Sequence, residues 1–467
     1  MVFLVGGANS ASGGYEISNS LRCNGTDSYL NFTLGTPTSQ RIATFSAWGK
    51  FNGQKSGSHD TSFWSMGDDY GQAMNVVRTK GTPQIYLDDS DGKQISWDNG
   101  PNFRDPSAWY HFVVQIDPTQ STDSNRMKWF INGTQLDNST NSSVGYPTQN
   151  YDIPGLASGQ TMTISKRASS SSHYIDGYIA EMIYLDGSIA APTEFGEVND
   201  NGVWIPKEPT GLTFGNNGSW LEFKQTGTSA NASGIGADTS GNTNHYTVNN
   251  LAAIDVTTDT PTNNFCTLNP LHKSTSDVVL SEGNLKMVSG YSSGWQHCAA
   301  TMAVRNGKWY WEAKALAVAA TDKTSIGVFQ FDTTDVDFIG VTNTDRSSKG
   351  ISGHGAGTGS YSYADDDIIM CGMDLDNNKV YWGKNGTWFG TLDPAAGSGS
   401  TTQTIDNSNF CVPAVGGYDD SSWELNFGVP QFSISSGNED DAGYGNFEYD
   451  VPSGFYSLCT KNLAEYG

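Results

Sequence analysis

Bulky apolar residues alternate with small or polar ones along residues 365–390, whose sequence is DDDIIMCGMDLDNNKVYWGKNGTWFG. The period of two over residues 368–375 is typical of a buried strand. Asp376-Asn377-Asn378 favours a turn, the apolar pattern resumes over residues 379–382, and Asn385-Gly386 is a strong hairpin signal. The stretch therefore predicts an antiparallel meander of three strands joined by two tight turns.

Strand-like patterns also recur through the first half of the chain, and no long segment has the period of 3.6 that marks a helix. Aromatic residues make up 12% of the chain and glycine occurs 54 times, which favours β-sandwiches over helical folds. One short helix is expected at residues 191–196, where Pro192 suits a first turn. These patterns predict an all-β protein. The clearest strand-like stretches of the first half are TFSAWGKF at 44–51, WYHFVV at 109–114, MKWFING at 127–133 and YIDGYIAEMIYL at 174–185.

The length of 467 residues is too great for one core, so two or three domains are expected. Residues 226–264 hold few large apolar side chains and many Gly, Asn, Thr and Asp, which is typical of a connector. A gap of that length is long for a free loop, so we expect it to be extended and packed along the domains. The predicted divisions are an N-terminal arm (1–18), a first sandwich (19–225), the connector (226–264), a second sandwich (265–435) and a tail packed on the second sandwich (436–467).

The formal net charge is −24, yet charged residues make up only 16% of the chain, below the usual level of about 25%. Asn, Ser, Thr and Gly must therefore cover the surface, and the negative charge argues against nucleic-acid binding. The chain has no run of the roughly 18 apolar residues that a membrane span needs. Its six cysteines form no C-x-x-C pair, so we expect no zinc or redox site; disulfides remain open, and Cys371 is expected to be a core residue.

The second half resembles the SPRY family over about residues 265–432. The resemblance implies a β-sandwich whose loops bind ligands on a shallow face, and it departs from the family at Asp366, where a glycine is usual. The matching stretches, in the order of the family's motifs, are 307–312 (GKWYWE), 325–328 (SIGV), 367–374, 385–390, 411–415 (CVPAV) and 423–428 (WELNFG).

The first half is similar to laminin-G-like, concanavalin A-like domains over about residues 19–224. Through residues 13–32, 238–251, 259–271 and 446–467, the chain as a whole resembles tail-fibre and capsid-fibre proteins of marine bacteriophages, which place such a domain before a SPRY domain. It departs from these proteins at Ala464, where a proline is usual. This resemblance implies a protein on the virion surface, released by lysis, whose partners are other virion proteins and a host-surface glycan or receptor. Fibre proteins are often trimeric, so a homo-oligomer is possible, although the chain has no heptads or β-helix repeats.

Three aromatic stretches of the second half are candidate binding loops: 291–297 (YSSGWQH), 353–363 (GHGAGTGSYSY) and 416–420 (GGYDD). Aromatic residues beside small polar ones suit sugar stacking and adaptable hydrogen bonds. Trp295 could instead belong to the core. The candidate ligand-binding residues are Tyr291, Trp295, His297, Tyr361, Tyr363, Tyr418 and Asp419.

No catalytic residue and no cofactor are expected. A glycosidase needs two carboxylates flanking the scissile bond, and Glu181 and Asp186 are most simply a strand face and a turn. His111 and His297 lie in strand-like runs and are interpreted as structural. Acidic turns could hold Ca²⁺, with a plain solvated turn as the alternative. The candidate calcium ligands are Asp68, Asp69, Asp88 and Asp91.

The N-terminal arm begins with an apolar run that includes Val2, Phe3, Leu4 and Val5, followed by a glycine-rich stretch. The run is too short for a signal peptide and lacks a basic leader. It could anchor the protein to the virion, or it could fold back on the first sandwich. Three functions remain open: a fibre or spike that recognises the host, a decoration protein of capsid or tail without a specific ligand, and a glycan depolymerase.

Overall fold

The computed structural model describes most of the residues of the chain. Within them the structure is almost entirely antiparallel β, with a single α-helix, α1 (Thr460–Tyr466). This confirms the predicted all-β class. The chain divides into two compact units that meet in sequence between Thr262 and Asn263. The described residues are 14–52, 62–67, 74–76, 85–87, 103, 105–136, 145–168, 173–290, 295–318, 324–330, 348–352, 363–399, 405, 408–417 and 419–467.

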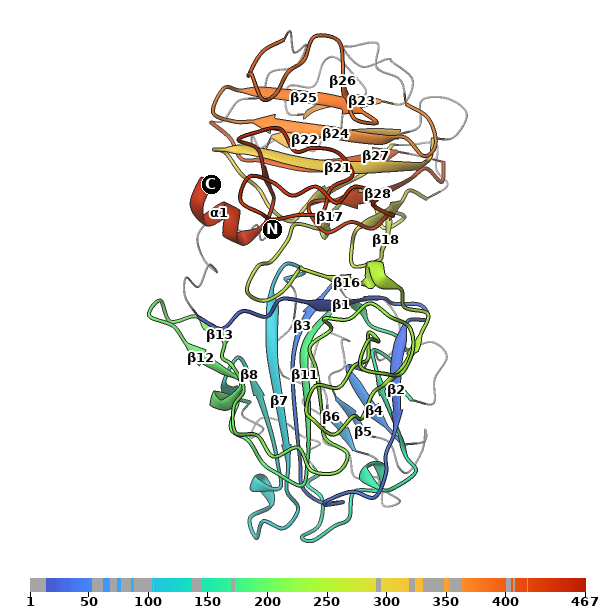
Figure 1. Ribbon diagram of the computed structural model, residues 1–467, viewed down its shortest axis with the longest axis vertical. Helices are drawn as coiled ribbons and strands as arrows, with labels where there is room; N and C mark the ends of the chain where they lie inside the picture. The colour runs from blue at the N-terminus through green and yellow to red at the C-terminus, as the bar shows by residue number, and fades with distance from the viewer. Residues whose placement is uncertain are drawn as a thin grey trace. The chain divides into compact units, whose positions relative to one another are not determined.

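In the described part of the first unit, eight strands form one sheet and six form another (Figure 1). The eight-stranded sheet has the order β16 (Val256–Thr257), β1 (Ser20–Asn24), β11 (Asp176–Asp186), β3 (Ala43–Phe51), β7 (Trp109–Ile116), β8 (Met127–Ile131) and β9 (Thr134–Gln135), and β14 (Ser219–Leu221) also pairs with β11. The six-stranded sheet has the order β15 (Thr247–Asn249), β2 (Tyr29–Thr33), β10 (Thr161–Ile164), β4 (Trp64–Met66), β5 (Met74–Val76) and β6 (Ile85–Leu87). A separate hairpin joins β12 (Gly196–Val198) to β13 (Trp204–Pro206). Short 3-10 turns are η1 (Asp123–Asn125), η2 (Pro154–Leu156), η3 (Pro192–Glu194), where a short helix was expected, and η4 (Ala253–Asp255).

Strand β3 shows how the alternating pattern builds the core of the first unit. Phe45 and Phe51 point into the main hydrophobic cluster between the sheets. Trp48 and Lys50 occupy alternate positions and therefore face the other side of the sheet, yet both are buried. Trp48 packs there with Ile17, which shows that chain segments outside the two sheets cover this outer face.

The segment predicted as a connector forms part of the first unit. Strand β15 pairs with β2 and β16 pairs with β1, so the segment supplies an edge strand to each sheet. Tyr246 is buried, and its hydroxyl lies 3.0 Å from Ser219 Oγ. Polar residues in this segment are held by specific hydrogen bonds rather than by a large apolar face, which is why its composition is that of a loop. The first unit therefore extends to Thr262, beyond the predicted boundary at residue 225.

The described part of the second unit also contains two sheets (Figure 1). The five-stranded sheet has the order β17 (Leu268–Lys273), β20 (Gln296–Ala300), β27 (Cys411–Gly417), β22 (Thr324–Gln330) and β23 (Ser348–Ser352). The eight-stranded sheet has the order β18 (Val279–Ser281), β19 (Lys286–Val288), β28 (Ser422–Asn426), β21 (Lys308–Ala317), β24 (Ile368–Asp374), β25 (Lys379–Lys384) and β26 (Thr387–Trp388), and β29 (Tyr456–Ser457) pairs with β21 in parallel.

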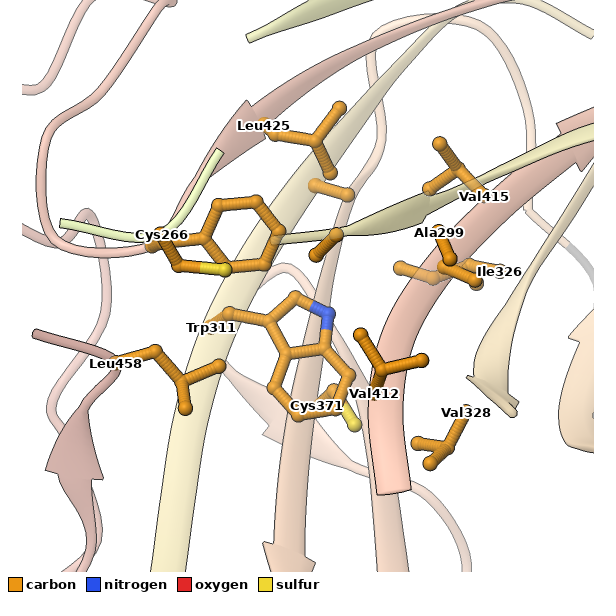
Figure 2. Packing of buried hydrophobic residues seen from close by; sticks show 14 of the residues in the cluster. Cys266, Ala299, Trp311, Ile326, Val328, Cys371, Val412, Val415, Leu425 and Leu458 are labelled. Atoms are coloured by element: carbon orange, nitrogen blue, oxygen red, sulfur yellow. The ribbon is translucent and has the colours of Figure 1, made fainter. Parts of the chain in front are cut away.

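The meander predicted from residues 365–390 is present as β24, β25 and β26. Asn378 and Asn385 adopt left-handed backbone conformations at its two turns, with φ of 58° and 48°. Trp311 of β21 lies in the core between the sheets, near Cys371 and Val412 (Figure 2). Cys371 is fully buried, as expected, and all six cysteines are free thiols.

The tail after residue 435 packs against the outer face of the eight-stranded sheet of the second unit. Phe447 and Phe455 form a second, smaller cluster there with Tyr310 and Tyr381. The carboxylate of Glu312 accepts hydrogen bonds from the backbone N–H groups of Glu448 at 3.0 Å and Tyr449 at 2.9 Å. The tail therefore covers a sheet face whose own side chains include tyrosines.

Candidate binding site at one end of the second sandwich

The strand register places the ends of several strands of the five-stranded sheet side by side. Gly417, the last residue of β27, pairs with both Gln296 and Thr324, the first residues of β20 and β22. Ser325 pairs with Ser352, the last residue of β23. The segments that precede β20 and β22 and those that follow β27 and β23 therefore start from the same end of the sheet.

The eight-stranded sheet contributes to this end as well. Ser422, which opens β28, pairs with Val288 and Ala317, the last residues of β19 and β21. Gly290 N–H donates to Gln296 Oε1 at 2.8 Å, which ties the end of β19 to the start of β20. The described ends of the three predicted binding loops consequently meet at one end of the sandwich, which we call the loop end.

Trp295 and Asp419 are the predicted ligand residues that the structure places at the loop end. Trp295 directly precedes β20 and is half-buried. Asp419 follows β27, is half-buried, and has a left-handed backbone with φ of 60°. Because β20 and β27 are neighbours, the two residues emerge from adjacent strand ends. Tyr291, Tyr361 and Tyr418 lie outside the described residues.

Tyr363 lies beneath the loop end, in the core. Its side chain is 5% exposed and its ring centroid lies 5.4 Å from that of Trp423. Trp423 Nε1–H donates to the carbonyl of Gly416 at 3.0 Å, which fixes the indole under the same strand ends. Burial raises the pKa of the Tyr363 hydroxyl. Tyr363 thus supports the loop end from below and offers no surface to a ligand in this conformation.

His297 is also buried, in the middle of strand pairing rather than in a loop. Its ring is 5.0 Å from Phe329 and 6.4 Å from His272, measured between centroids. Burial, with a smaller contribution from His272, lowers the pKa of His297 to about 4, and burial also lowers the pKa of His272. Both rings are neutral at pH 7, which agrees with the structural interpretation of His297.

Two hydroxyl residues at the loop end were missed by sequence reasoning. Thr324 and Ser325 open β22 and are both fully buried. The Ser325 hydroxyl oxygen has no hydrogen-bond partner within the described structure, whereas the Thr324 hydroxyl interacts with the Tyr363 hydroxyl and partly opposes the rise in its pKa. A Cβ added to Gly416 would lie 2.8 Å from the backbone oxygen of Gln296 and 3.0 Å from Ser325 Oγ, so a larger residue at this position would force neighbouring atoms to shift. The only signal in the sequence was a Thr-Ser pair at the start of a predicted strand, which is common and therefore uninformative.

His111 in the first unit has a contact that resembles part of a catalytic pair. Its Nε2 lies 2.9 Å from Ser46 Oγ, while Trp204 Nε1–H donates to its Nδ1 at 3.1 Å. A neutral ring that accepts at Nδ1 carries its proton on Nε2, so it donates to Ser46 and cannot act as its base. Burial lowers the pKa of His111 to about 3, which keeps the ring neutral. His111 is therefore structural, as predicted.

The two carboxylates considered for glycosidase chemistry occupy different environments. Asp186 accepts backbone N–H groups from Thr38 at 2.8 Å and Asn217 at 3.0 Å, which organises turns. Glu181 is 3% exposed and accepts a hydrogen bond from the Tyr15 hydroxyl at 2.5 Å. Asp186 therefore has a structural role in organising turns, and the carboxyl group of Glu181 is covered by Tyr15.

The remaining predicted residues fall where the structure gives no description. The calcium candidates Asp68, Asp69, Asp88 and Asp91 and the anchor residues Val2, Phe3, Leu4 and Val5 lie outside the described ranges. Among the residues that are described, no three His, Cys, Asp or Glu side chains gather as a metal site. No helix in the described ranges is long and apolar enough to cross a bilayer.

No family model and no curated protein matches the sequence. Among solved structures, the chain is similar to the SPRY domain of human HERC1, with 16% identity over 34% of this chain and 96% of that one, at a TM-score of 0.26. It is also similar to the NEUZ (NHR) domain of Neuralized from Drosophila melanogaster, with 12% identity over 34% and 90% of the two chains and a TM-score of 0.25. Domain 4 of AbnA, a GH43 extracellular arabinanase from Geobacillus stearothermophilus in complex with arabinotriose, matches with 15% identity over 39% and 78%, at a TM-score of 0.26. A shared activity does not follow from similarity at this level.

Proposed function

We propose that the protein is a non-enzymatic fibre or spike protein on the surface of a bacteriophage virion, and that it binds a host-surface glycan or protein through the loop end. The observation that supports recognition is the meeting of the predicted loops at one end of a firmly packed sandwich. Loops held by a rigid scaffold are where proteins usually carry recognition. The virion assignment rests on the sequence resemblance to phage fibre proteins.

A glycan is the ligand class that fits the chemistry best. Trp295 supplies an apolar ring with a polar N–H edge, which suits stacking on a sugar face. Asp419 supplies carboxylate oxygens that accept hydrogen bonds from hydroxyl groups. The low fraction of charged residues gives little basis for binding a strongly ionic partner.

A glycan array probed with the full chain tests this proposal. Trp295→Ala should weaken binding to any captured glycan by about tenfold, equivalent to about 1.4 kcal/mol, and Asp419→Asn should weaken it less. Asp152→Asn, an exposed acid of the first unit, serves as the matched control and should leave binding unchanged. If neither the array nor whole host cells bind the protein, recognition through the loop end is refuted.

A decoration protein without a ligand is the second candidate. Burial of Tyr363 and His297 favours it, because two of the predicted ligand residues are removed from the surface. Virions that lack the protein distinguish the two functions: a decoration protein leaves adsorption to the host intact, whereas a receptor-binding fibre does not. Incubation with host envelope tests the depolymerase alternative, which requires release of sugar.

A further inference from the structure

The outer face of the six-stranded sheet of the first unit is polar at its β15 edge. Leu30 of β2 pairs with Val248 of β15, and both side chains pack in or against the core between the sheets. Side chains alternate along a strand, so Tyr29, Asn31 and Asn249 lie on the opposite, outer face. All three are half-buried. This edge of the sheet therefore presents a phenol and two amide groups at the surface of the first unit.

Asn31 and Asn249 form a fixed pair of amide groups. Asn249 Nδ2–H donates to Asn31 Oδ1 at 2.7 Å and to the carbonyl of Thr247 at 3.3 Å. The NH₂ group of Asn31 and the side-chain oxygen of Asn249 have no partner among the described residues. The pair thus holds donors and an acceptor side by side. Each hydroxyl group of a sugar both donates and accepts, so adjacent hydroxyl groups match this arrangement.

A short hairpin places a lysine at one end of this face. Lys166 pairs with Tyr174 in an isolated antiparallel bridge, and Arg167 N–H donates to the carbonyl of His173 at 3.1 Å. The Thr163 hydroxyl donates to the Lys166 carbonyl at 2.8 Å, which ties the hairpin to β10. The backbone of Lys166 is therefore held by contacts both within the hairpin and with the sheet.

The ammonium of Lys166 lies over two tyrosine rings. Its Nζ is 4.3 Å from the ring centroid of Tyr29 and 5.6 Å from that of Tyr174, and the two centroids are 6.2 Å apart. An aromatic face attracts a cation but offers no lone pair to its N–H groups. The rings therefore position the half-buried lysine and leave its three donors to a further partner.

No carboxylate pairs with Lys166 within the described residues. Other cations of this acidic chain do have such a partner, as Arg41 has in Asp152. Asp27, on the turn before β2, accepts from Asn24 Nδ2 at 2.8 Å instead. A positive charge held in position without a counter-ion is suited to an anionic ligand, because charge-assisted hydrogen bonds to carboxylate or sulfate are strong.

Tyr29 and Asn31 are two residues apart on β2, which separates them by about 7 Å along the strand. The cation over Tyr29 and the amide pair at Asn31 therefore lie within the reach of one or two sugar residues. We propose that this surface is a second binding site, for an acidic oligosaccharide whose carboxylate or sulfate pairs with Lys166 and whose hydroxyl groups bind the two amides. We call it the amide face, and it consists of Tyr29, Asn31, Lys166 and Asn249. It belongs to the first unit and does not depend on the loop end.

An array of uronate- and sulfate-bearing oligosaccharides, each beside its neutral counterpart, tests the proposal with the full chain. The acidic members should bind at least about tenfold more tightly than their neutral counterparts, because only they complete the charge-assisted contact. The difference should shrink as ionic strength rises, since salt screens an exposed charge. Trp295→Ala, which alters the loop end, should leave the binding of the acidic members unchanged.

Substitutions on the amide face locate the site. Lys166→Gln should weaken binding of the acidic members by about tenfold, and Lys166→Arg, which keeps the charge, should retain most of it. Asn31→Ala should weaken binding by about fivefold, since it removes neutral hydrogen bonds. Lys207→Gln is the matched control, because it removes the same charge from a lysine of the first unit whose ammonium donates to the Thr193 carbonyl at 2.9 Å. Binding by this variant should be unchanged.

Equal capture of acidic and neutral members would overturn the proposal, as would acidic binding that survives Lys166→Gln. An equal loss in Lys207→Gln would show that only overall charge matters, which also refutes a site at Lys166. A loss in Trp295→Ala would assign the acidic ligand to the loop end, and so overturn the amide face while leaving the proposed function intact. If near-ultraviolet circular dichroism shows that Lys166→Gln does not fold, Asn31→Ala decides the question, and unchanged binding by that variant refutes the site.

Discussion

Lys50 and Asp259 place an ion pair in the interior of the first unit. The Lys50 Nζ and Asp259 Oδ2 atoms are 2.7 Å apart, and their side chains are 0% and 1% exposed. Trp109 Nε1–H also donates to Asp259 Oδ1, at 3.3 Å. Removing one member of such a pair leaves the other charge buried without its partner. The loss of stability on breaking the pair is therefore larger than the net stability that the intact pair contributes.

Asp259→Asn should therefore lower the free energy of unfolding of the first unit by about 3–5 kcal/mol, because the Lys50 charge remains buried. Denaturant titration followed by tryptophan fluorescence measures the change. The control is Asp152→Asn, which breaks the pair that Asp152 forms with Arg41 at 2.6 Å, where both side chains are substantially exposed. That loss should be much smaller, because solvent screens an exposed ion pair. Equal effects of the two variants would show that Lys50 is not isolated from water.

Glu312 is a fully buried acid of the second unit. Tyr310 donates to it at 2.9 Å, in addition to the two backbone N–H groups of the tail. Burial raises its pKa to about 7, although these hydrogen bonds oppose the shift. The folded state consequently binds this proton more tightly than the unfolded state does.

The contribution of Glu312 to stability should be greatest below pH 4.5 and should fall as pH rises to about 7. The fall amounts to roughly 3 kcal/mol, from a pKa difference of about 2.5 units. Unfolding free energies of the wild type and Glu312→Gln, measured from pH 4 to pH 8, isolate it as a difference. The difference between the unfolding free energies of the wild type and Glu312→Gln should decrease as pH rises. A difference that increases with pH would contradict the raised pKa of Glu312.

At the scale of elements, the tail completes the second unit. Strand β29 adds to β21 in parallel, and helix α1 follows directly. Phe455 is fully buried beside Tyr381, with ring centroids 6.3 Å apart. These contacts make residues 436–467 part of the packed structure, although hydrophobic patterning in the tail is sparse.

Phe455→Ala should destabilise the second unit by about 3–5 kcal/mol through loss of burial and the cavity that remains. Thermal unfolding of the fragment 263–467 measures this directly. Tyr466→Ala near the C-terminus provides a comparison, because that residue is 36% exposed and its ring stacks on Tyr456. A loss for Phe455→Ala no larger than that for Tyr466→Ala would mean that the tail docks weakly.

At the scale of the whole molecule, the boundary between the two units lies after Thr262. The change in amino-acid composition that predicted a boundary lies earlier, after Gln225. Residues 226–262 supply β15, β16 and Asp259 to the first unit, whereas Asn263 and Asn264 bind the C-terminal helix region through Lys461 and Thr460. Each of these contacts therefore lies within the unit to which its residues belong.

Fragments cut at the two boundaries should behave differently. A fragment that ends at Thr262 should unfold cooperatively, whereas one that ends at Gln225 should be molten or insoluble, because it exposes two sheet edges and removes Asp259, the ion-pair partner of Lys50. The fragment 263–467 should also unfold cooperatively. Near-ultraviolet circular dichroism during heating measures these transitions, and a cooperative transition in the shorter fragment would place the boundary at 225 after all.

The sequence by itself determined the local structure of this protein. The alternation around Cys371 and the Asn-Gly turn at Asn385 were enough for the meander, because side-chain period and turn conformation depend on neighbouring residues. The sequence predicted only part of the loop end. Trp295 and Asp419 lie at the loop end, as the predicted loops implied, but Tyr363 and His297 are buried. Burial depends on which distant segments cover a strand.

Tertiary structure alone decided the rest. The connector became edge strands because partners some 200 residues away, such as Lys50 for Asp259, satisfy its polar groups. The buried hydroxyls of Thr324 and Ser325, the docked tail and the contact between Tyr15 and Glu181 likewise arise from pairing between remote parts of the chain. The local hydrophobic pattern indicates on which face of a strand a side chain lies. Which residue it contacts on that face is decided only when the sheets assemble.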